Sequence, residues 1–139
     1  MDEFQWSIGT DLPERDVRVV SEGVLADGRA LAAAGDARPL ACLVRQQGRV
    51  VAGGAARTEY GRLFVQSLWV DEPLRSRGLG SAILQKLEAQ ARSAGCTSSL
   101  LETLSDRAAA FYRRLGYASI AQLPGYVGPF TRHILLKVL

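Results

Sequence analysis

The sequence predicts one α/β domain, residues 1–139, built on a mixed sheet of about seven strands with helices on both faces. The first observation behind this prediction is composition. The 139 residues, 47% apolar and 22% charged, can bury a core without a metal or a disulfide. The second is that short β-branched segments alternate with segments of helical periodicity. The third is that no repeat, linker or low-complexity tract separates these segments, so a domain boundary has no place to fall.

The N-terminal segment is expected to form a short strand and then two helices. Residues 4–8 alternate apolar and polar side chains, which is typical of a strand. Asp11 offers a capping side chain, and Pro13 suits the first turn of the helix that follows. Apolar residues continue this helix at helical spacing, namely Val17, Val20, Val24 and Leu25. A second, weaker helix is predicted over residues 26–34, ending at Gly35.

The middle of the chain predicts three strands joined by tight turns. Residues 40–45, 50–58 and 62–70 are rich in β-branched and other apolar side chains. Gly48 and Gly61 end the two turns between them. We therefore expect the three strands to pair as antiparallel hairpins.

The second half of the chain alternates between helix and strand. The pattern predicts a helix over residues 79–94, a strand over 98–104, a helix over 108–115, and strands over 118–123 and 133–138 around a loop at 124–129. Strands joined by a helix are expected to be parallel neighbours, and strands joined by a turn antiparallel ones.

The charge balance favours a small phosphorylated ligand over a nucleic acid or a membrane. The net charge is only +3, and every basic residue except Lys86 and Lys137 is an arginine, which suits bidentate contact with phosphate. No clusters of lysine with interleaved aromatics suggest a nucleic-acid surface. No run of 18 apolar residues is long enough to cross a membrane, and the acidic start is unlike a secretory signal, so we expect a cytoplasmic protein. Cys42 and Cys96 are expected to be buried, reduced thiols.

The segment over residues 67–81 carries the most specific chemistry. A strand ends there, a loop containing Arg75 and Arg77 follows, and a helix begins after Gly78 and Gly80. Unpaired backbone amides at a helix N-terminus bind anions, and glycines let the backbone approach them closely. The pattern predicts a pyrophosphate cradle; the alternative is a tight turn with solvated arginines. A P-loop and a dinucleotide fingerprint are both missing.

Residues 68–80, followed by residues 108–117, resemble the GNAT acyltransferase superfamily. The resemblance extends over roughly residues 40–139. It implies a GNAT-like fold and transfer of an acetyl group from acetyl-coenzyme A to a primary amine of a small molecule or peptide, by direct attack in a ternary complex. The alternative is a non-catalytic acyl-coenzyme A-binding protein on the same fold. The resemblance implies no metal cofactor, and His133, the only histidine, is expected to have a packing role. The exposed edge strands expected in such a sheet favour a homodimer.

The family resemblance also implies the residues of the site. Cofactor contacts would come from Leu68, Trp69, Val70, Arg75, Ser76, Arg77, Gly78, Leu79, Gly80 and Ser81. Tyr112 matches the tyrosine that often protonates the departing thiolate. Ser105 stands where the family often has an asparagine that touches the pantetheine arm, and serine is shorter.

The chemistry requires a route for the proton of the amine. A lysine-like amine has a pKa of about 10.4, so deprotonating it at pH 7 costs about 4.6 kcal/mol. Glu102, at the end of the strand beside the cofactor strand, is the candidate base; Glu59, Asp71 and ordered water are the alternatives. An irregularity in the strand over residues 62–70 would supply a backbone amide to the carbonyl oxygen of the thioester.

Overall fold

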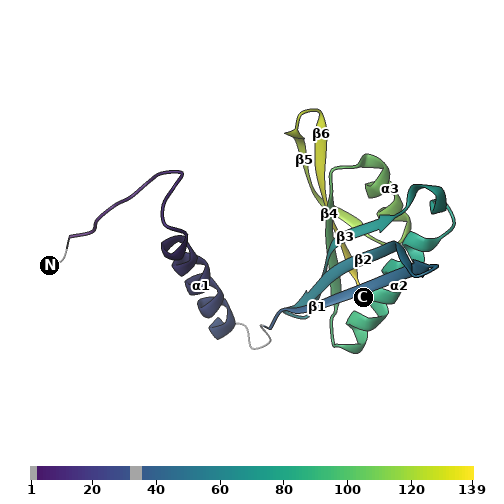
Figure 1. The fold of residues 1–139 in the computed structure, drawn as a ribbon, viewed down its shortest axis with the longest axis horizontal. Helices are drawn as coiled ribbons and strands as arrows, with labels where there is room; N and C mark the ends of the chain where they lie inside the picture. The colour runs from purple at the N-terminus through teal and green to yellow at the C-terminus, as the bar shows by residue number, and fades with distance from the viewer. Residues whose placement is uncertain (1–2, 32–35) are drawn as a thin grey trace. The chain divides into compact units, whose positions relative to one another are not determined.

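The computed structural model describes residues 3–31 and 36–139, and contacts divide the chain into two units, Met1–Gly35 and Asp36–Leu139. In its described residues the first unit holds one helix, α1 (Glu14–Leu31), drawn in purple in Figure 1. The second unit holds the sheet and the remaining helices. That the whole chain acts as a single domain stays a prediction.

Helix α1 differs from the sequence-based prediction in two respects. It runs without a break through the start of the second predicted helix, residues 26–34, whose predicted end at Gly35 lies outside the described residues. Residues 3–9 form no strand, so the strand predicted over residues 4–8 is wrong. A strand needs a hydrogen-bonding partner, and the described part of this unit offers none. The start of α1 lies close to the predicted one: the helix begins at Glu14, and the Pro13 carbonyl accepts from the amides of Asp16 and Val17 at 2.9 and 3.1 Å. Capping by the Asp11 side chain stays a prediction.

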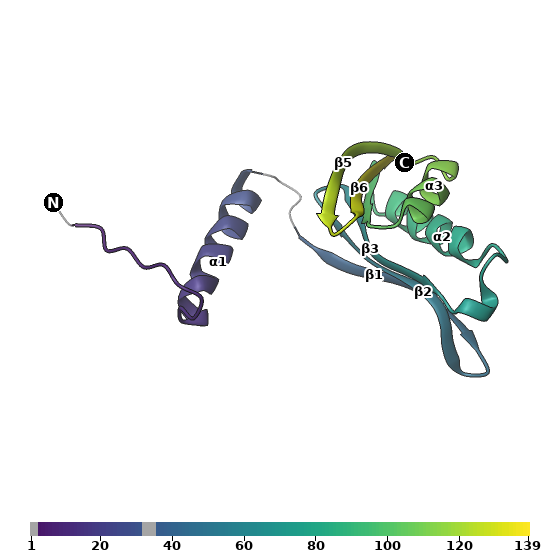
Figure 2. The same cartoon turned by 90° about the horizontal axis from the view of Figure 1, so that it is seen from above.

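The second unit contains one six-stranded sheet in the order β1-β2-β3-β4-β6-β5, seen from two sides in Figures 1 and 2. Its strands are β1 (Arg38–Gln46), β2 (Arg49–Glu59), β3 (Arg62–Val70), β4 (Ser98–Thr103), β5 (Ala118–Val127) and β6 (Phe130–Val138). Its helices are the short η1 (Glu72–Leu74), α2 (Leu79–Ser93) and α3 (Asp106–Arg114). The predicted mixed α/β class is therefore confirmed, with six strands in the described residues instead of seven. None of the described helices is both long and apolar enough to span a bilayer.

The strand pairing agrees with the prediction except at one place. β1, β2 and β3 pair as antiparallel hairpins, and β3 and β4, joined by α2, are parallel neighbours. β4 and β5, joined by α3, were also expected to be neighbours, but β6 lies between them and is antiparallel to both. Burial explains this order. Every residue of β5 is exposed, which suits an edge, whereas Leu135 of β6 is fully buried and suits the interior.

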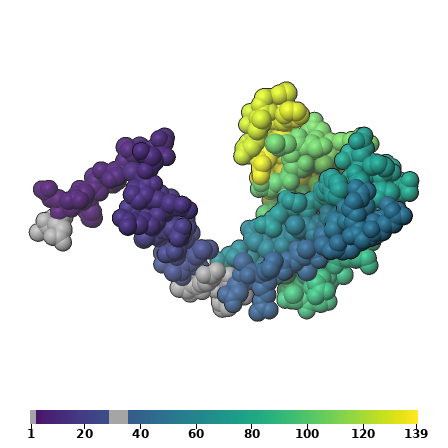
Figure 3. Space-filling view, in the orientation of Figure 1, coloured from purple at the N-terminus to yellow at the C-terminus, as the bar shows by residue number. Residues whose placement is uncertain are grey.

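Strand β5 is longer than predicted and takes up most of the expected loop over residues 124–129. It continues to Val127, with a shift in pairing register between Leu123 and Val127, and leaves only Gly128 and Pro129 outside the two strands. Pro124 donates no hydrogen bond to a ladder, but an edge strand tolerates that loss. The turn end of this hairpin extends past α3, as Figures 1 and 3 show.

Helices α2 and α3 cover the same face of the sheet (Figure 2), so the prediction of helices on both faces is not tested by these two helices and stays a prediction. α2 packs on β1, β2 and β3, while α3 packs on β4, β5 and β6. The core between them is made of residues that alternate along the strands and repeat along the helices, such as Leu63, Leu101, Ile83, Leu87 and Leu135. Both cysteines are free; Cys96 is buried, as predicted, and its burial raises the pKa of its thiol, whereas Cys42 is half-buried.

A buried polar network joins α2 to the sheet. The Tyr117 hydroxyl donates to Glu88 at 2.8 Å and lies 2.7 Å from the Ser99 hydroxyl, and the Lys137 ammonium donates to Glu88 at 2.9 Å. Burial raises the pKa of Tyr117, so its hydroxyl stays a donor. The network gives the buried Glu88 carboxylate the partners that a charge in the core requires.

Candidate functional site

Strands β3 and β4 separate near the middle of the sheet. Their parallel pairing runs from Arg62 opposite Ser98 to Val65 opposite Leu101 and goes no further, although both strands continue. On its other side β3 carries a bulge at the same level, since successive β2 residues pair with Val65 and with Ser67 and pass over Gln66. The irregularity expected in this strand is therefore present. The opening between β3 and β4 therefore lies beside Gln66, whose backbone amide is outside the regular β2–β3 register.

The N-terminus of α2 lies beyond this opening and has no side-chain cap. Its N-cap residue, Gly78, has φ 82° and ψ 6°, a left-handed conformation that favours glycine. The Ala82 amide donates to the Gly78 carbonyl at 3.0 Å, so the preceding amides of residues 79–81 have no partner within the helix. By contrast, the Ser105 hydroxyl caps α3 by accepting from the Ala108 amide at 3.0 Å. The uncapped α2 terminus is therefore available to an anion.

A cavity of about 500 Å³ connects the end of β3 to the N-termini of α2 and α3. Its lining includes three arginines, Arg75, Arg107 and Arg114, and no acidic residue. Arg75 is held by a 2.9 Å hydrogen bond from its Nε to the Val70 carbonyl, which leaves its two terminal nitrogens for other partners. A cavity with this charge and with free helix amides suits a ligand with several phosphate groups.

The cavity gathers nearly all of the predicted cofactor residues. It is lined by Leu68, Trp69, Val70, Arg75, Ser76, Gly78, Leu79, Gly80, Ser81 and Ser105, together with Tyr112. Arg77 is the exception, since it is not part of the lining. The sequence-based reasoning missed Arg107 and Phe111, whose spacing to Arg114 (i, i+4, i+7) marks one face of α3 and could have revealed them. From the sequence, Arg113 and Arg114 are expected to form a solvated helix face or to contact the 3′-phosphate of the cofactor; of the two, Arg114 lines the cavity.

Tyr112 presents its ring to the cavity from α3. Its ring centroid lies 5.4 Å from that of Phe111 and 6.0 Å from that of Tyr117, so two aromatic neighbours fix its position. Burial raises the pKa of Tyr112 above its ordinary value. A hydroxyl in this environment remains protonated near neutral pH and can donate a hydrogen bond to an anion that forms beside it.

Glu102 lies in a second groove, of about 400 Å³, lined by Arg57, Phe64, Val65, Gln66, Leu100, Leu101, Glu102 and Arg132. Because side chains alternate along a strand, Glu102 points to the face opposite the buried Leu101, away from α2 and α3. Its carboxylate forms an ion pair with Arg132, and this hydrogen bond raises the pKa of the guanidinium. Gln66, at the bulge, lines the same groove.

The two alternative bases are placed differently from Glu102. Glu59 is paired with Arg57 at 3.6 Å, and Asp71 accepts from the Glu72 amide at 3.0 Å and lies 3.7 Å from Arg49. Neither carboxylate lines the cavity or the groove. The structure therefore brings only Glu102, of these three candidates, to the opening in the sheet.

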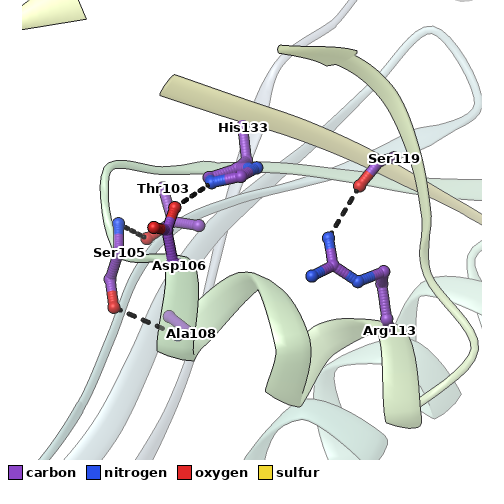
Figure 4. A network of polar contacts seen from close by, with 7 residues as sticks. All are labelled: Thr103, Ser105, Asp106, Ala108, Arg113, Ser119 and His133. Atoms are coloured by element: carbon purple, nitrogen blue, oxygen red, sulfur yellow. Dashed lines mark hydrogen bonds and ion pairs between the residues drawn. The ribbon is translucent and has the colours of Figure 1, made fainter. Parts of the chain in front are cut away.

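A polar network anchors the N-terminus of α3 (Figure 4). His133 Nε2 lies 2.6 Å from an Asp106 carboxylate oxygen, and the Ser105 amide donates to the Thr103 hydroxyl at 3.1 Å. Arg113 donates to the Ser119 hydroxyl at 3.0 Å and does not line the cavity, whereas Arg114 does. His133 is buried in β6, in keeping with the expected packing role.

Comparison with known proteins gives a family that covers most of the chain. Residues 6–117 match the Acetyltransferase (GNAT) family. Blasticidin-S acetyltransferase from Streptomyces morookaense is 37% identical over 109 residues, which cover 75% of this chain and 80% of that protein. An acetyltransferase from Bacillus cereus has the same fold, with a TM-score of 0.88 at 22% identity over 96% of this chain and 98% of its own. An aminoglycoside 6′-N-acetyltransferase complexed with coenzyme A gives a TM-score of 0.63 at 21% identity over 72% of each chain. The chain therefore belongs to the GNAT acetyltransferase family.

Proposed function

We propose that this acetyltransferase moves an acetyl group from acetyl-coenzyme A to a primary amine of a small molecule, by direct attack in a ternary complex. The observation that carries the proposal is the opening between β3 and β4, with an arginine-lined cavity on the helix side and a carboxylate-bearing groove on the other face. Two substrates entering from opposite faces would meet at this opening, which is the geometry that direct transfer requires.

The cavity offers a separate binding element to each part of coenzyme A. The pyrophosphate would accept from the amides of Leu79, Gly80 and Ser81, with Arg75 supplying charge. The pantetheine arm would lie along Leu68, Trp69 and Val70, where β3 has lost its pairing with β4 and its backbone groups are free to bind a ligand. Arg107 and Arg114 are placed for the remaining phosphate.

In the proposed reaction the amine nitrogen attacks the thioester carbonyl carbon, a C–N bond forms and the C–S bond breaks. Glu102 takes the proton of the amine, directly or through water, and Tyr112 gives its proton to the departing thiolate. The backbone amide of Gln66, at the bulge, would stabilise the negative charge that develops on the carbonyl oxygen of the thioester. Tyr112 lines the cavity, and burial raises the pKa of its hydroxyl, so the proton is still present when the thiolate forms.

The choice of a small-molecule amine draws support from the relatives. One is named for acetylation of blasticidin S, and a protein of the same fold is named for the 6′-amine of aminoglycosides and is complexed with coenzyme A. The groove at Glu102 is large enough for part of such a molecule.

A panel of small amines and peptides, with thiol release from acetyl-coenzyme A as the readout, tests the proposal. Coenzyme A binding without thiol release from any amine would favour the non-catalytic alternative.

Replacing the proposed base tests the fate of the amine proton. Glu102→Gln should lower kcat/KM about 10²-fold near pH 7, because the variant relies on the small fraction of amine that is already neutral. The defect should shrink as the pH rises toward the pKa of the amine and the neutral form becomes abundant. The measurement is the pH profile of kcat/KM for the variant and for the unmodified protein.

The matched control is Glu72→Gln, which removes an exposed carboxylate that lines neither the cavity nor the groove. It should leave the pH profile unchanged. A Glu102→Gln profile identical to that of the unmodified protein would move the base elsewhere. A defect of the same shape in Glu59→Gln or Asp71→Asn would identify which of the two takes its place.

A further inference from the structure

The groove on the face of the sheet opposite α2 and α3 has a charge pattern that the transfer reaction alone does not require. A base and an opening would suffice for transfer, yet the lining carries two guanidinium groups, of Arg57 and Arg132, and the single carboxylate of Glu102. The floor between them is apolar, formed by Phe64 and Leu100, which lie opposite one another across β3 and β4. The lining therefore carries two guanidinium groups and one carboxylate, while Glu59, which pairs with Arg57, lies outside it. Arg57 is separated from Glu102 and Arg132 by the apolar floor.

Both guanidinium groups are held in place before any ligand binds. The Arg57 guanidinium carbon stacks 4.3 Å above the centre of the Phe64 ring, and its Nε lies 3.6 Å from Glu59. The Arg132 guanidinium carbon lies 5.0 Å from the centre of the Tyr126 ring, and its terminal Nη2 is paired with Glu102. Such groups lose little conformational freedom when they bind an anion.

The two arginines differ in which guanidinium nitrogens remain free to bind a ligand. Arg132 already uses a terminal nitrogen on Glu102, whereas Arg57 meets Glu59 through Nε. Among the described residues, the two terminal nitrogens of Arg57 have no hydrogen-bonding partner, and they form the edge of the guanidinium that binds a carboxylate with two parallel hydrogen bonds. The Arg57 side chain is 36% exposed, so water and a ligand can both reach it.

We propose that the groove selects an acceptor that carries a carboxylate as well as the reacting amine, with Arg57 binding the carboxylate and Glu102 facing the amine. The proposal rests on the proposed transferase function. Arg57 lies on β2 and Glu102 on β4, with β3 between them. Neighbouring strands are about 4.8 Å apart, so β2 and β4 are separated by roughly 10 Å. The amine and the carboxylate of the acceptor are therefore several bonds apart, as in an ω-amino acid.

The test compares acceptors that differ only in the carboxylate. 6-Aminohexanoate and 6-aminohexanamide present the same primary amine, but the amide has no anionic group for Arg57. The unmodified protein should use the acid with at least a tenfold higher kcat/KM, which corresponds to about 1.4 kcal/mol. Glycine, whose amine and carboxylate are adjacent, should be a poor acceptor in the same assay.

Substitutions separate recognition by Arg57 from a merely structural role. Arg57→Gln should remove the preference for the acid by raising its KM, with kcat for both acceptors and the affinity for coenzyme A unchanged. Arg57→Lys should restore part of the preference, since an ammonium keeps the charge but loses the paired hydrogen bonds. Arg92→Gln, an exposed arginine on α2 that lines neither cavity, is the matched control and should keep the full preference.

Four outcomes are decisive. Acid and amide used equally by the unmodified protein would overturn the proposal and leave the transferase function standing. An acid preference that persists in Arg57→Gln would also overturn it. If no amine is acetylated, calorimetry with 6-aminohexanoate in the presence of coenzyme A gives the answer. Binding that Arg57→Gln abolishes would support the carboxylate site and overturn transfer, whereas no binding would overturn both.

Discussion

Gly80→Val is expected to lower the affinity for coenzyme A by at least about a hundredfold while the protein stays folded. A Cβ at position 80 would lie 3.5 Å from the Phe111 ring and 3.9 Å from Val70, so the two further methyl groups of valine have to occupy the cavity itself. They would hold the pyrophosphate away from the α2 amides. Hydrogen bonds to a charged acceptor contribute about 1.5–3 kcal/mol each, and losing two of them accounts for the expected change. Calorimetry with coenzyme A measures it, and circular dichroism reports the fold.

The control for this substitution is Gly80→Ala. Its single methyl group makes only ordinary van der Waals contact with Phe111, so most of the affinity should remain. A graded series, with alanine mild and valine severe, supports close approach of the ligand to the backbone. Unchanged affinity in a folded Gly80→Val protein would show that the anion does not lie at the N-terminus of α2.

Tyr112→Phe is expected to lower kcat by about 10²–10⁴-fold with little change in coenzyme A affinity. The substitution keeps the ring, and therefore the contacts with Phe111 and Tyr117, and removes only the hydroxyl. The departing thiolate would then take its proton from water. Steady-state kinetics with a fixed amine, together with calorimetry for coenzyme A, separate an effect on turnover from an effect on binding.

Tyr60→Phe provides the comparison for Tyr112→Phe, because Tyr60 is exposed in the turn between β2 and β3 and lines neither cavity. It should leave both kcat and affinity unchanged. If Tyr112→Phe retains full turnover, Tyr112 has only a packing role and another donor protonates the thiolate.

The elements of the second unit were largely predictable because their signals are local. The helical spacing from Leu79 and the β-branched run over residues 62–70 depend only on neighbours in the sequence, and both elements begin at the predicted residue. Strand order is not local. Nothing near residues 118–123 shows that β6 lies between β4 and β5, since that place is decided by which strand buries more apolar surface, as Leu135 does.

The candidate site likewise has one part that the local sequence predicts and other parts that depend on how the strands pair. The cradle around Gly78 and Gly80 follows from residues that are adjacent in the sequence, and the structure places both in the cavity lining. The bulge at Gln66 depends on the register between β2 and β3, which no single strand encodes. The groove between Arg57 and Arg132 joins residues from four strands, and the pairing of Glu102 with Arg132 crosses from β4 to β6, so neither could be found before the sheet was known.

Single-turnover analysis tests the central claim most directly. The protein, in excess over acetyl-coenzyme A, is mixed with acetyl-coenzyme A and 6-aminohexanoate, and free thiol and N-acetylated product are quantified over time by a thiol reagent and by mass spectrometry. Direct transfer predicts that thiol and N-acetyl product appear together, in equal amounts, with no acetylated protein at any time. Thiol release without N-acetylated amine, an acetyl group that accumulates on the protein first, or bound acetyl-coenzyme A that remains intact with every amine of the panel would contradict direct transfer to an amine.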